Sequence, residues 1–335
     1  MNHNLVEMMV NNWAEKYAAS GDKARRDEIR ATLRRLRFLE KKLFAYYEPS
    51  LPPNPNYWQR LTDWLQTFPS DDDREVALKL AGNLYFIGQK EIEAMHRAAY
   101  FGQIRRWLID AFRLNLIDVD LSAKLERSTR ETWFCPITDS MKINTFFHAN
   151  NIPSQINHRP DWHSLAKFGD SKRILDYIEM KGIKAIVLLE DFIATGSQAI
   201  KAIQYAANLR PGNPIPVLVV PLVLCPQGVA MFKAAALPAH VTIEPVLQLE
   251  NHHFVSEHAA ASSPYDCFRL LAERTYVQVC GGVAAGGNTS PYHPLGFGRT
   301  GGLVVLGTNT PDNTLPLVHW KSATWKPLFP RHSRV

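Results

Sequence analysis

The stretch AIVLLEDFIATGSQAIKAI, residues 185–203, decides the fold of the carboxy-terminal part of this chain. Four features follow one another in it. A continuous apolar run at 185–189 is typical of a strand buried on both faces of a sheet. Two adjacent acids follow, Glu190 and Asp191, and then a short loop and a segment with helical character. This order predicts the strand, loop and helix of an α/β fold.

The loop of this stretch has the chemistry of a sugar-phosphate site. Ligands of open α/β sheets bind at the carboxyl ends of strands, and a loop that enters a helix there offers free backbone amides to a phosphate. Gly196 lets the backbone approach closely, and Thr195 and Ser197 add two hydroxyl donors. Glu190 and Asp191 can accept hydrogen bonds from vicinal sugar hydroxyls. The alternative is a plain strand–turn–helix with an acidic turn, which would not require these residues in this order.

Strands and helices alternate through the rest of residues 126–335. The expected strands are 132–137, 185–189, 217–224, 241–247 and 303–306. The expected helices are 140–149, 171–180, 198–209 and 264–275. Such alternation predicts a mostly parallel sheet with helices on both faces. We therefore expect residues 126–335 to form one α/β domain.

Residues 1–125 show apolar residues at helical spacing instead. The stripes are Ile29, Leu33, Leu36 and Leu43; Trp58, Leu61, Leu65 and Phe68; and Val76, Leu80 and Leu84. Ser70, followed by three aspartates, is a good helix start, since a hydroxyl caps the helix and the acids favour its positive end. The pattern predicts an all-helical domain that serves assembly or partner binding.

One helix of this region carries a basic row. Residues 23–42 contain nine Lys or Arg and three acids, so their net charge is 9 − 3 = +6. The row consists of Arg26, Arg30, Arg34, Arg37 and Lys41, whose spacing of three or four places them on one helix face. Such a row can contact nucleic-acid phosphates. A solvated helix face is the alternative.

Composition excludes several other classes of protein. The 335 residues contain four widely spaced cysteines, which argues against a disulfide framework or zinc finger. We find no signal peptide, and no run approaches the ~20 apolar residues that span a bilayer, so a cytoplasmic protein without membrane association is expected. The histidines His158 and His163, and His252, His253 and His258, lack a completing carboxylate or cysteine, so no protein-bound metal site is predicted.

The sequence EDFIATGSQ, residues 190–198, resembles the phosphoribosyl-diphosphate motif of type I phosphoribosyltransferases. The resemblance implies a type I phosphoribosyltransferase-like sheet, with Glu190 and Asp191 as candidate catalytic residues that hold the ribose 2′- and 3′-hydroxyls. It also implies that the 5′-phosphate lies in a loop formed by Ala194, Thr195, Gly196, Ser197 and Gln198. The family usually has Ser or Thr where this chain has Gln198, so the phosphate contact at that position differs.

The block at residues 294–331, PLGFGRTGGLVVLGTNTPDNTLPLVHWKSATWKPLFPR, is similar to the terminal block of phosphoribosyltransferase-like proteins from bacterial conflict systems. Some of these are encoded beside retron reverse transcriptases. This resemblance implies a role in antiphage defence, as an effector or toxin component. A reverse transcriptase with its RNA or DNA becomes a candidate partner in an oligomer or larger complex.

Two further loops are candidate ligand sites. A phosphoribosyltransferase needs a diphosphate loop earlier in the sheet, and Thr138, Asp139 and Ser140 follow the strand at 132–137. Asp139 would cap the next helix, and the amides behind it could bind an anion. The alternative is a purely structural cap without a ligand. A second loop carries Asn309, Asn313 and Thr314. These side chains suit either a ligand's base and sugar or the hydrogen bonds of their own turns.

These features favour chemistry at the anomeric carbon of a ribose-5-phosphate group. The ligand would be phosphoribosyl diphosphate or a nucleotide, and the reaction either phosphoribosyl transfer or nucleotide cleavage. Mg²⁺ would enter with a diphosphate substrate, whose oxygens suit it. One alternative is a non-catalytic nucleotide sensor. Another is a nucleic-acid-associated subunit of a defence ribonucleoprotein, which would use the basic row.

Overall fold

The computed structural model describes residues 3–50, 55–153, 171–256, 265–281 and 293–332. The chain forms two compact units. Unit 1 combines Met1–Gln89 with Asn251–Val335, and unit 2 is Lys90–Glu250. This grouping differs from the division expected near residue 125, because the carboxy-terminal block belongs to the same unit as the amino-terminal helices.

Unit 2 contains a five-stranded parallel sheet, which confirms the expected α/β class. Its strands are β2 (Thr132–Pro136), β3 (Ala185–Ile193), β4 (Val217–Leu224), β5 (Val241–Ile243) and β6 (Leu247–Gln248). The order is β2-β3-β4-β5, and β6 pairs with β4 beyond the end of β5. The segment expected as one strand at 241–247 is therefore two short strands on the same neighbour.

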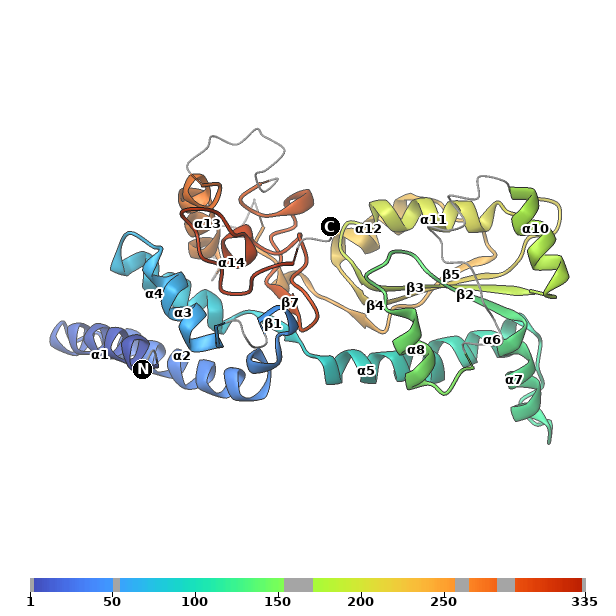
Figure 1. Ribbon diagram of the computed structural model, residues 1–335, viewed down its shortest axis with the longest axis horizontal. Coiled ribbons are helices and arrows are strands. Elements are labelled where there is room, and N and C mark those ends of the chain that lie inside the picture. Colours follow the sequence, from blue (N-terminus) through green and yellow to red (C-terminus); the bar gives the residue numbers. More distant parts are fainter. Residues whose placement is uncertain (1–2, 51–54, 154–170, 257–264, 282–292, 333–335) are drawn as a thin grey trace. The chain divides into compact units, whose positions relative to one another are not determined.

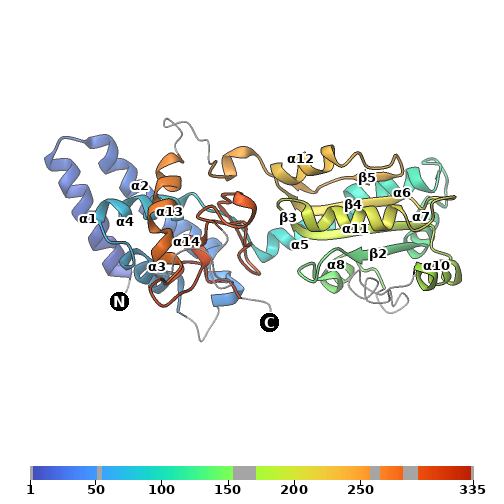
Figure 2. The ribbon, with the colours of Figure 1, turned by 90° about the horizontal axis from the view of Figure 1, so that it is seen from above.

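Helices cover both faces of this sheet. On one face lie α5 (Gln89–Ala98), α6 (Arg105–Ala111) and α8 (Ile143–Ala149), and on the other lie α10 (Ser171–Met180), α11 (Ser197–Ala207) and α12 (Pro226–Ala234) (Figures 1 and 2). A π-helix, η3 (Ala99–Ile104), joins α5 to α6, and α7 (Leu121–Arg130) leads into β2. Burial on both faces explains why residues 185–189 of β3 and all of β4 are continuous apolar runs.

Unit 1 is mainly helical, but it also contains a parallel strand pair. Its longer helices are α1 (His3–Ala19), α2 (Lys23–Lys42), α3 (Tyr57–Gln66), α4 (Asp71–Gly82), α13 (Asp266–Val279) and α14 (Pro316–His319). Its 3₁₀ turns are η1 (Phe44–Tyr46), η2 (Glu48–Ser50), η4 (Asn251–His253) and η5 (Phe297–Arg299). Strand β1 (Tyr85–Ile87) pairs with β7 (Val304–Leu306). The expectation that residues 1–125 are all helical is thus wrong at β1, where too few residues alternate for the sequence to reveal a strand.

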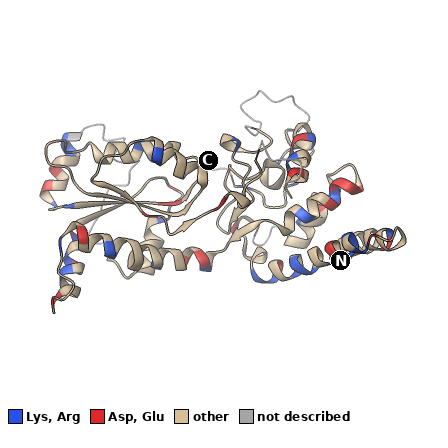
Figure 3. Ribbon diagram, turned by 180° about the vertical axis from the view of Figure 1, so that it is seen from behind, with Lys and Arg blue, Asp and Glu red and all other residues tan. Residues whose placement is uncertain are grey.

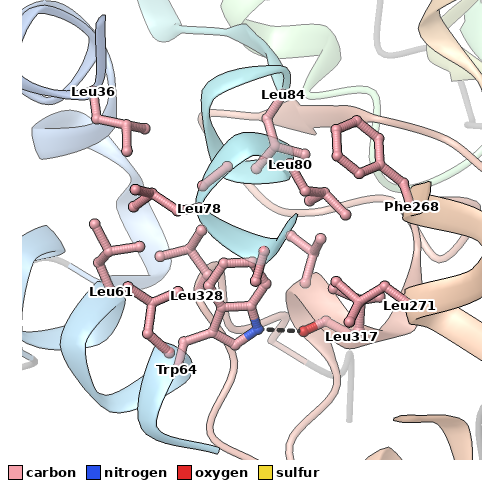
Figure 4. Packing of buried hydrophobic residues seen from close by; sticks show 14 of the residues in the cluster. Leu36, Leu61, Trp64, Leu78, Leu80, Leu84, Phe268, Leu271, Leu317 and Leu328 are labelled. Atoms are coloured by element: carbon pink, nitrogen blue, oxygen red, sulfur yellow. Dashed lines mark hydrogen bonds between the residues drawn. The ribbon is translucent and has the colours of Figure 1, made fainter. Parts of the chain in front are cut away.

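Both ends of the chain build the core of unit 1. Trp64 of α3 is fully buried, and its indole N–H donates to the Leu317 carbonyl at 2.7 Å. Figure 4 shows Leu61 and Leu78 from the amino-terminal helices around the same core as Leu271 and Leu317. The sequence-predicted cap at the start of α4 is also present, since the Ser70 hydroxyl accepts from the Asp73 N–H. The carboxy-terminal block therefore supplies part of the hydrophobic core against which the helices of residues 3–82 pack.

Candidate functional site

The two acids occupy the last part of β3, where the strand passes into the loop. Strand β3 extends to Ile193, beyond the expected end at residue 189, so Glu190 and Asp191 lie within it. Because successive side chains of a strand point to opposite faces, the two carboxylates have different surroundings. Glu190 is buried and Asp191 is half-buried. The acids that looked equivalent in sequence are distinct in the fold.

Glu190 binds the loop that follows the neighbouring strand β2. Its carboxylate accepts hydrogen bonds from the Thr138 backbone N–H at 2.8 Å, from the Thr138 hydroxyl and from the Ser140 hydroxyl at 3.1 Å. The Ser140 hydroxyl also lies 2.9 Å from Asp191 Oδ1. The structure therefore brings together the acids and the candidate diphosphate loop, which are far apart in sequence.

Asp139 does not have the capping role that the sequence suggested. Helix α8 starts at Ile143, its N-cap residue is Lys142, and no side chain caps it by a hydrogen bond. The expected helix start at residue 140 is displaced because Thr138 and Ser140 turn toward Glu190 instead. Asp139 is exposed at the tip of this loop.

The surroundings of the acid pair shift the pKa of Glu190. Burial and the neighbouring Asp191 carboxylate together raise the pKa of Glu190 to about 8, against the hydrogen bonds from Thr138 and Ser140, which lower it. Two carboxylates this close cannot both ionise freely. Because the two groups titrate together, the pair as a whole keeps a proton above the usual pH range of a glutamate.

The loop after β3 has the geometry of an anion site. Gly196 is the N-cap residue of α11 with φ +80°, a left-handed conformation that favours glycine. A Cβ atom there would lie 3.2 Å from the Met231 side chain. Ser197 and Gln198 are exposed, and the backbone N–H groups of Gln198 and Ala199 meet no acceptor among the described residues. Unpaired amides at a helix start are the donors that bind phosphates.

The loop hydroxyls complete this arrangement. Thr195 Oγ1 lies 3.2 Å from Ser197 Oγ, and the Ser197 N–H points to Thr195 Oγ1 at 3.5 Å. Ala194 is buried and belongs to the supporting side of the loop. Of residues 194–198, the structure thus exposes Ser197 and Gln198 and half-buries Thr195.

Gly228 supports the same loop and was not identified from the sequence. It lies in the first turns of α12, where an added Cβ would be 3.1 Å from the Ala194 carbonyl oxygen and 2.8 Å from the Leu224 side chain. The backbone of α12 can therefore approach the loop only with glycine at this position. The available signal was Cys225-Pro226 after the strand, since proline is favoured at the first position of a helix.

Asn309, Asn313 and Thr314 lie in unit 1, whereas Glu190 lies in unit 2. The Asn313 amide donates to Phe297 O at 3.0 Å and Thr300 Oγ1 at 3.1 Å, and the Thr314 hydroxyl donates to Val304 O. The Asn309 amide donates to His332 O, and its oxygen accepts from the His332 and Thr310 N–H groups. These bonds favour the turn-forming alternative for all three residues.

The basic row lies along α2, where Lys and Arg recur on the ribbon (Figure 3). Arg30, Arg34 and Lys41 are exposed. Arg26 pairs with Asp27 at 2.9 Å, and Arg37 pairs with Glu7 of α1. Two of the five charges are therefore partly neutralised within the chain.

The described part of the chain contains neither a metal-binding cluster nor a membrane-spanning helix. No group of three or more His, Cys, Asp or Glu in it could hold a metal ion, although His158, His163 and His258 lie outside the described residues. Within the same part, every helix is too short or too polar to cross a membrane.

Comparison with known proteins gives one family. No curated protein and no solved structure is significantly similar to this chain. The sequence profile of the PRTase-CE family, however, matches residues 61–331, a range that includes the EDFIATGSQ loop and the block at 294–331. Since this match covers most of both units, the chain belongs to the PRTase-CE family, a phosphoribosyltransferase-like family.

Proposed function

We propose that unit 2 binds a 5-phosphoribosyl group, carried by phosphoribosyl diphosphate or a nucleotide, and acts at its anomeric carbon. One observation carries this proposal: two amides at the start of α11 meet no acceptor among the described residues, and Asp191 lies in the last part of the strand that leads into this loop. A phosphate on the amides and vicinal hydroxyls on Asp191 would use both features at once. Family membership supports the same class of ligand.

The two acids have different roles in this proposal. Asp191, which is half-buried, accepts the hydrogen bonds of the ribose hydroxyls. Glu190, whose oxygens already accept from Thr138 and Ser140, is a positioning residue that holds the 138–140 loop at the same end of the sheet. In this proposal, that loop meets the diphosphate or the base of the ligand.

Chemistry at the anomeric carbon passes through a transition state that resembles an oxocarbenium ion. The chain would contribute by fixing the phosphate and the hydroxyls and by placing negative charge near the developing positive charge. Mg²⁺ would be bound mainly by diphosphate oxygens and would shield their charge. On the protein, the Asp191 carboxylate is the oxygen ligand that fits it, because Glu190 is already engaged.

Isotope-traced turnover separates an enzyme from a nucleotide sensor. We would incubate the full chain with labelled phosphoribosyl diphosphate and cellular nucleotides, with and without Mg²⁺, and measure ribose 5-phosphate affinity by calorimetry. Asp191→Asn should reduce turnover and affinity at least tenfold, whereas Asp110→Asn, an exposed acid of α6, should change neither. Saturable binding without turnover supports the sensor. Neither binding nor turnover by the wild-type chain would refute the proposal.

The resemblance of the terminal block supports a further part of the proposal, an effector role in antiphage defence beside a reverse transcriptase and its RNA or DNA. The exposed charges of α2 favour such a partner, and the exposed ring of Phe38 lies among them. Charge neutralisation gives sequence-independent, salt-sensitive binding. Replacing Arg30, Arg34 and Lys41 with Gln should lower the slope of log affinity against log salt by about 0.9 per lost contact. An unchanged slope between 50 and 200 mM salt would mean that the row is a solvated surface.

A further inference from the structure

Unit 2 contains a cavity of about 390 Å³ at the amino end of β2, away from the loop that follows β3. Its wall includes Thr129, which precedes β2, and Asn150, which follows α8. Thr138 and Ser140 follow the carboxyl end of the same strand. The cavity and the phosphoribosyl site therefore lie at opposite ends of β2. The volume is within the range of small-molecule sites.

The cavity is built on the π-helix η3. Such turns are rare, and where they occur they are often part of a functional site. This one places Tyr100 and Phe101 in the wall, with ring centroids 5.2 Å apart, and α6 begins directly after it at Arg105. The Arg105 guanidinium lies over the Phe101 ring, 5.5 Å from its centroid. The wall thus offers flat apolar faces next to a cation.

Two oxygen acceptors of the wall complement these groups. The Asn150 amide nitrogen donates to the carbonyls of His96 and Phe146, which fixes the orientation of this buried side chain. Its oxygen Oδ1 is then left with no hydrogen-bond donor in the described structure. Glu126 adds an exposed carboxylate to the wall. The exposed Glu126 carboxylate can accept from amino or hydroxyl groups of a ligand, whereas Asn150 Oδ1 lies buried behind the wall surface.

We propose that this cavity is a second ligand site, for a free nucleotide, separate from the phosphoribosyl loop. The planar base stacks on the aromatic wall, the phosphate binds the Arg105 guanidinium, and the amino or hydroxyl groups of the ligand donate to the exposed Glu126 carboxylate. Strand β2 and helix α8 connect this cavity to the 138–140 loop, so the nucleotide occupies a position from which it can influence that loop.

Calorimetry with AMP, GMP, CMP and UMP tests the proposal. The full chain carrying Gly196→Ala is used, because this substitution weakens phosphate binding by the 194–198 loop. At least one nucleotide should bind, and Phe101→Leu and Arg105→Gln should each weaken it at least tenfold. Arg106→Gln is the matched control, because Arg106 is the next residue of α6, is exposed, and pairs with Glu244 outside the cavity.

Thermal unfolding of each variant provides the folding control. Phe101 is 56% exposed, so its replacement removes little packing and the variants should melt with the parent chain. If no nucleotide binds the Gly196→Ala chain, or if both wall variants bind as tightly as the parent, the cavity is not a nucleotide site. Neither result would bear on ribose 5-phosphate binding by the wild-type loop, which is measured separately.

Discussion

Two polar loops of this chain each follow a buried strand, and in sequence they look alike. Residues 194–198 follow β3 in unit 2, and residues 309–314 follow β7 in unit 1. Both are rich in Thr, Asn, Asp or Ser. In the first loop, two helix-start amides are left without acceptors, whereas in the second the side chains of Asn313 and Thr314 donate to backbone or hydroxyl oxygens of unit 1.

The two loops differ in whether their hydrogen-bonding groups are already paired within the fold. A polar side chain buried in a turn is normally satisfied by its own backbone, as Asn313 is. A loop that enters a long helix leaves the first amides of that helix unpaired, because no preceding turn supplies their carbonyl acceptors. Residue types alone therefore do not distinguish a ligand loop from a turn, but the element that follows the loop does.

The largest effect is expected at Gly196, where the comparison is sharpest. Gly196→Ala places a side chain at φ +80° and a Cβ atom 3.2 Å from Met231, a conformation that costs about 1–2 kcal/mol. The loop should relax and withdraw its amides. Each charge-assisted hydrogen bond lost is worth about 1.5–3 kcal/mol, so ribose 5-phosphate affinity, measured by calorimetry, should fall at least tenfold.

Gly212→Ala is the matched control for this prediction. Gly212 is in the same unit, and a Cβ atom there would meet no atom within 4 Å. This variant should bind ribose 5-phosphate as the wild type does. An unchanged affinity in Gly196→Ala would place the phosphate elsewhere and would remove the contrast between the two loops.

Asn313 and Thr314 should show the opposite pattern. Asn313→Ala removes donors from Phe297 O and Thr300 Oγ1, and Thr314→Val removes the donor to Val304 O in β7. Leaving such buried groups unsatisfied costs about 1–3 kcal/mol each. Urea unfolding should show this loss while ribose 5-phosphate affinity stays unchanged. A loss of affinity at full stability would make the 309–314 loop a ligand loop after all.

A smaller effect concerns the pH dependence that Glu190 gives to unit 2. Its pKa is raised from 4.5 to about 8 in the fold, so between these values the folded chain binds more protons than the unfolded chain. The contribution of this group to stability is therefore greatest below pH 4.5 and is lost as the pH rises toward about 8. The slope for one proton is at most about 1.4 kcal/mol per pH unit.

Glu190→Gln should remove this slope, because glutamine does not titrate and its amide can still contact Thr138 and Ser140. Urea unfolding of wild type and variant at pH 5, 6, 7 and 8 measures the difference between their stabilities. We expect the variant to gain on the wild type as the pH rises. Parallel pH profiles would show that Glu190 is ionised in the fold.

Periodicity and residue order were enough to predict the parallel sheet and the site loop. The apolar run at 185–189 can only be a strand buried on both faces, and Gly196 with its neighbours marks the start of α11. The roles of the two acids could not be predicted, because they depend on strand register. Ile137 N–H donates to Leu189 O at 2.9 Å, and this pairing brings Thr138 beside Glu190 and not beside Asp191.

The grouping of the chain into units escaped prediction for a related reason. Strand β1 has three residues, and all of unit 2 separates it in sequence from its partner β7. Short strands carry too little periodicity to be recognised, and long-range pairing leaves no local pattern. Gly301 shows the same limit: a Cβ atom there would collide with the Val255 carbonyl oxygen, and no local sequence pattern indicates this contact.

The pairing of β1 with β7 also sets an order of assembly on the ribosome. Residues 90–250 are contiguous, so all of unit 2 has been synthesised before Val304, Val305 and Leu306 emerge to meet Tyr85, Phe86 and Ile87. Domains fold as units during synthesis. The parallel sheet of unit 2 can therefore form before the partner strand of β1 has been synthesised. A nascent chain arrested before residue 300 would present a finished sheet unit beside helices whose apolar faces remain open to chaperones.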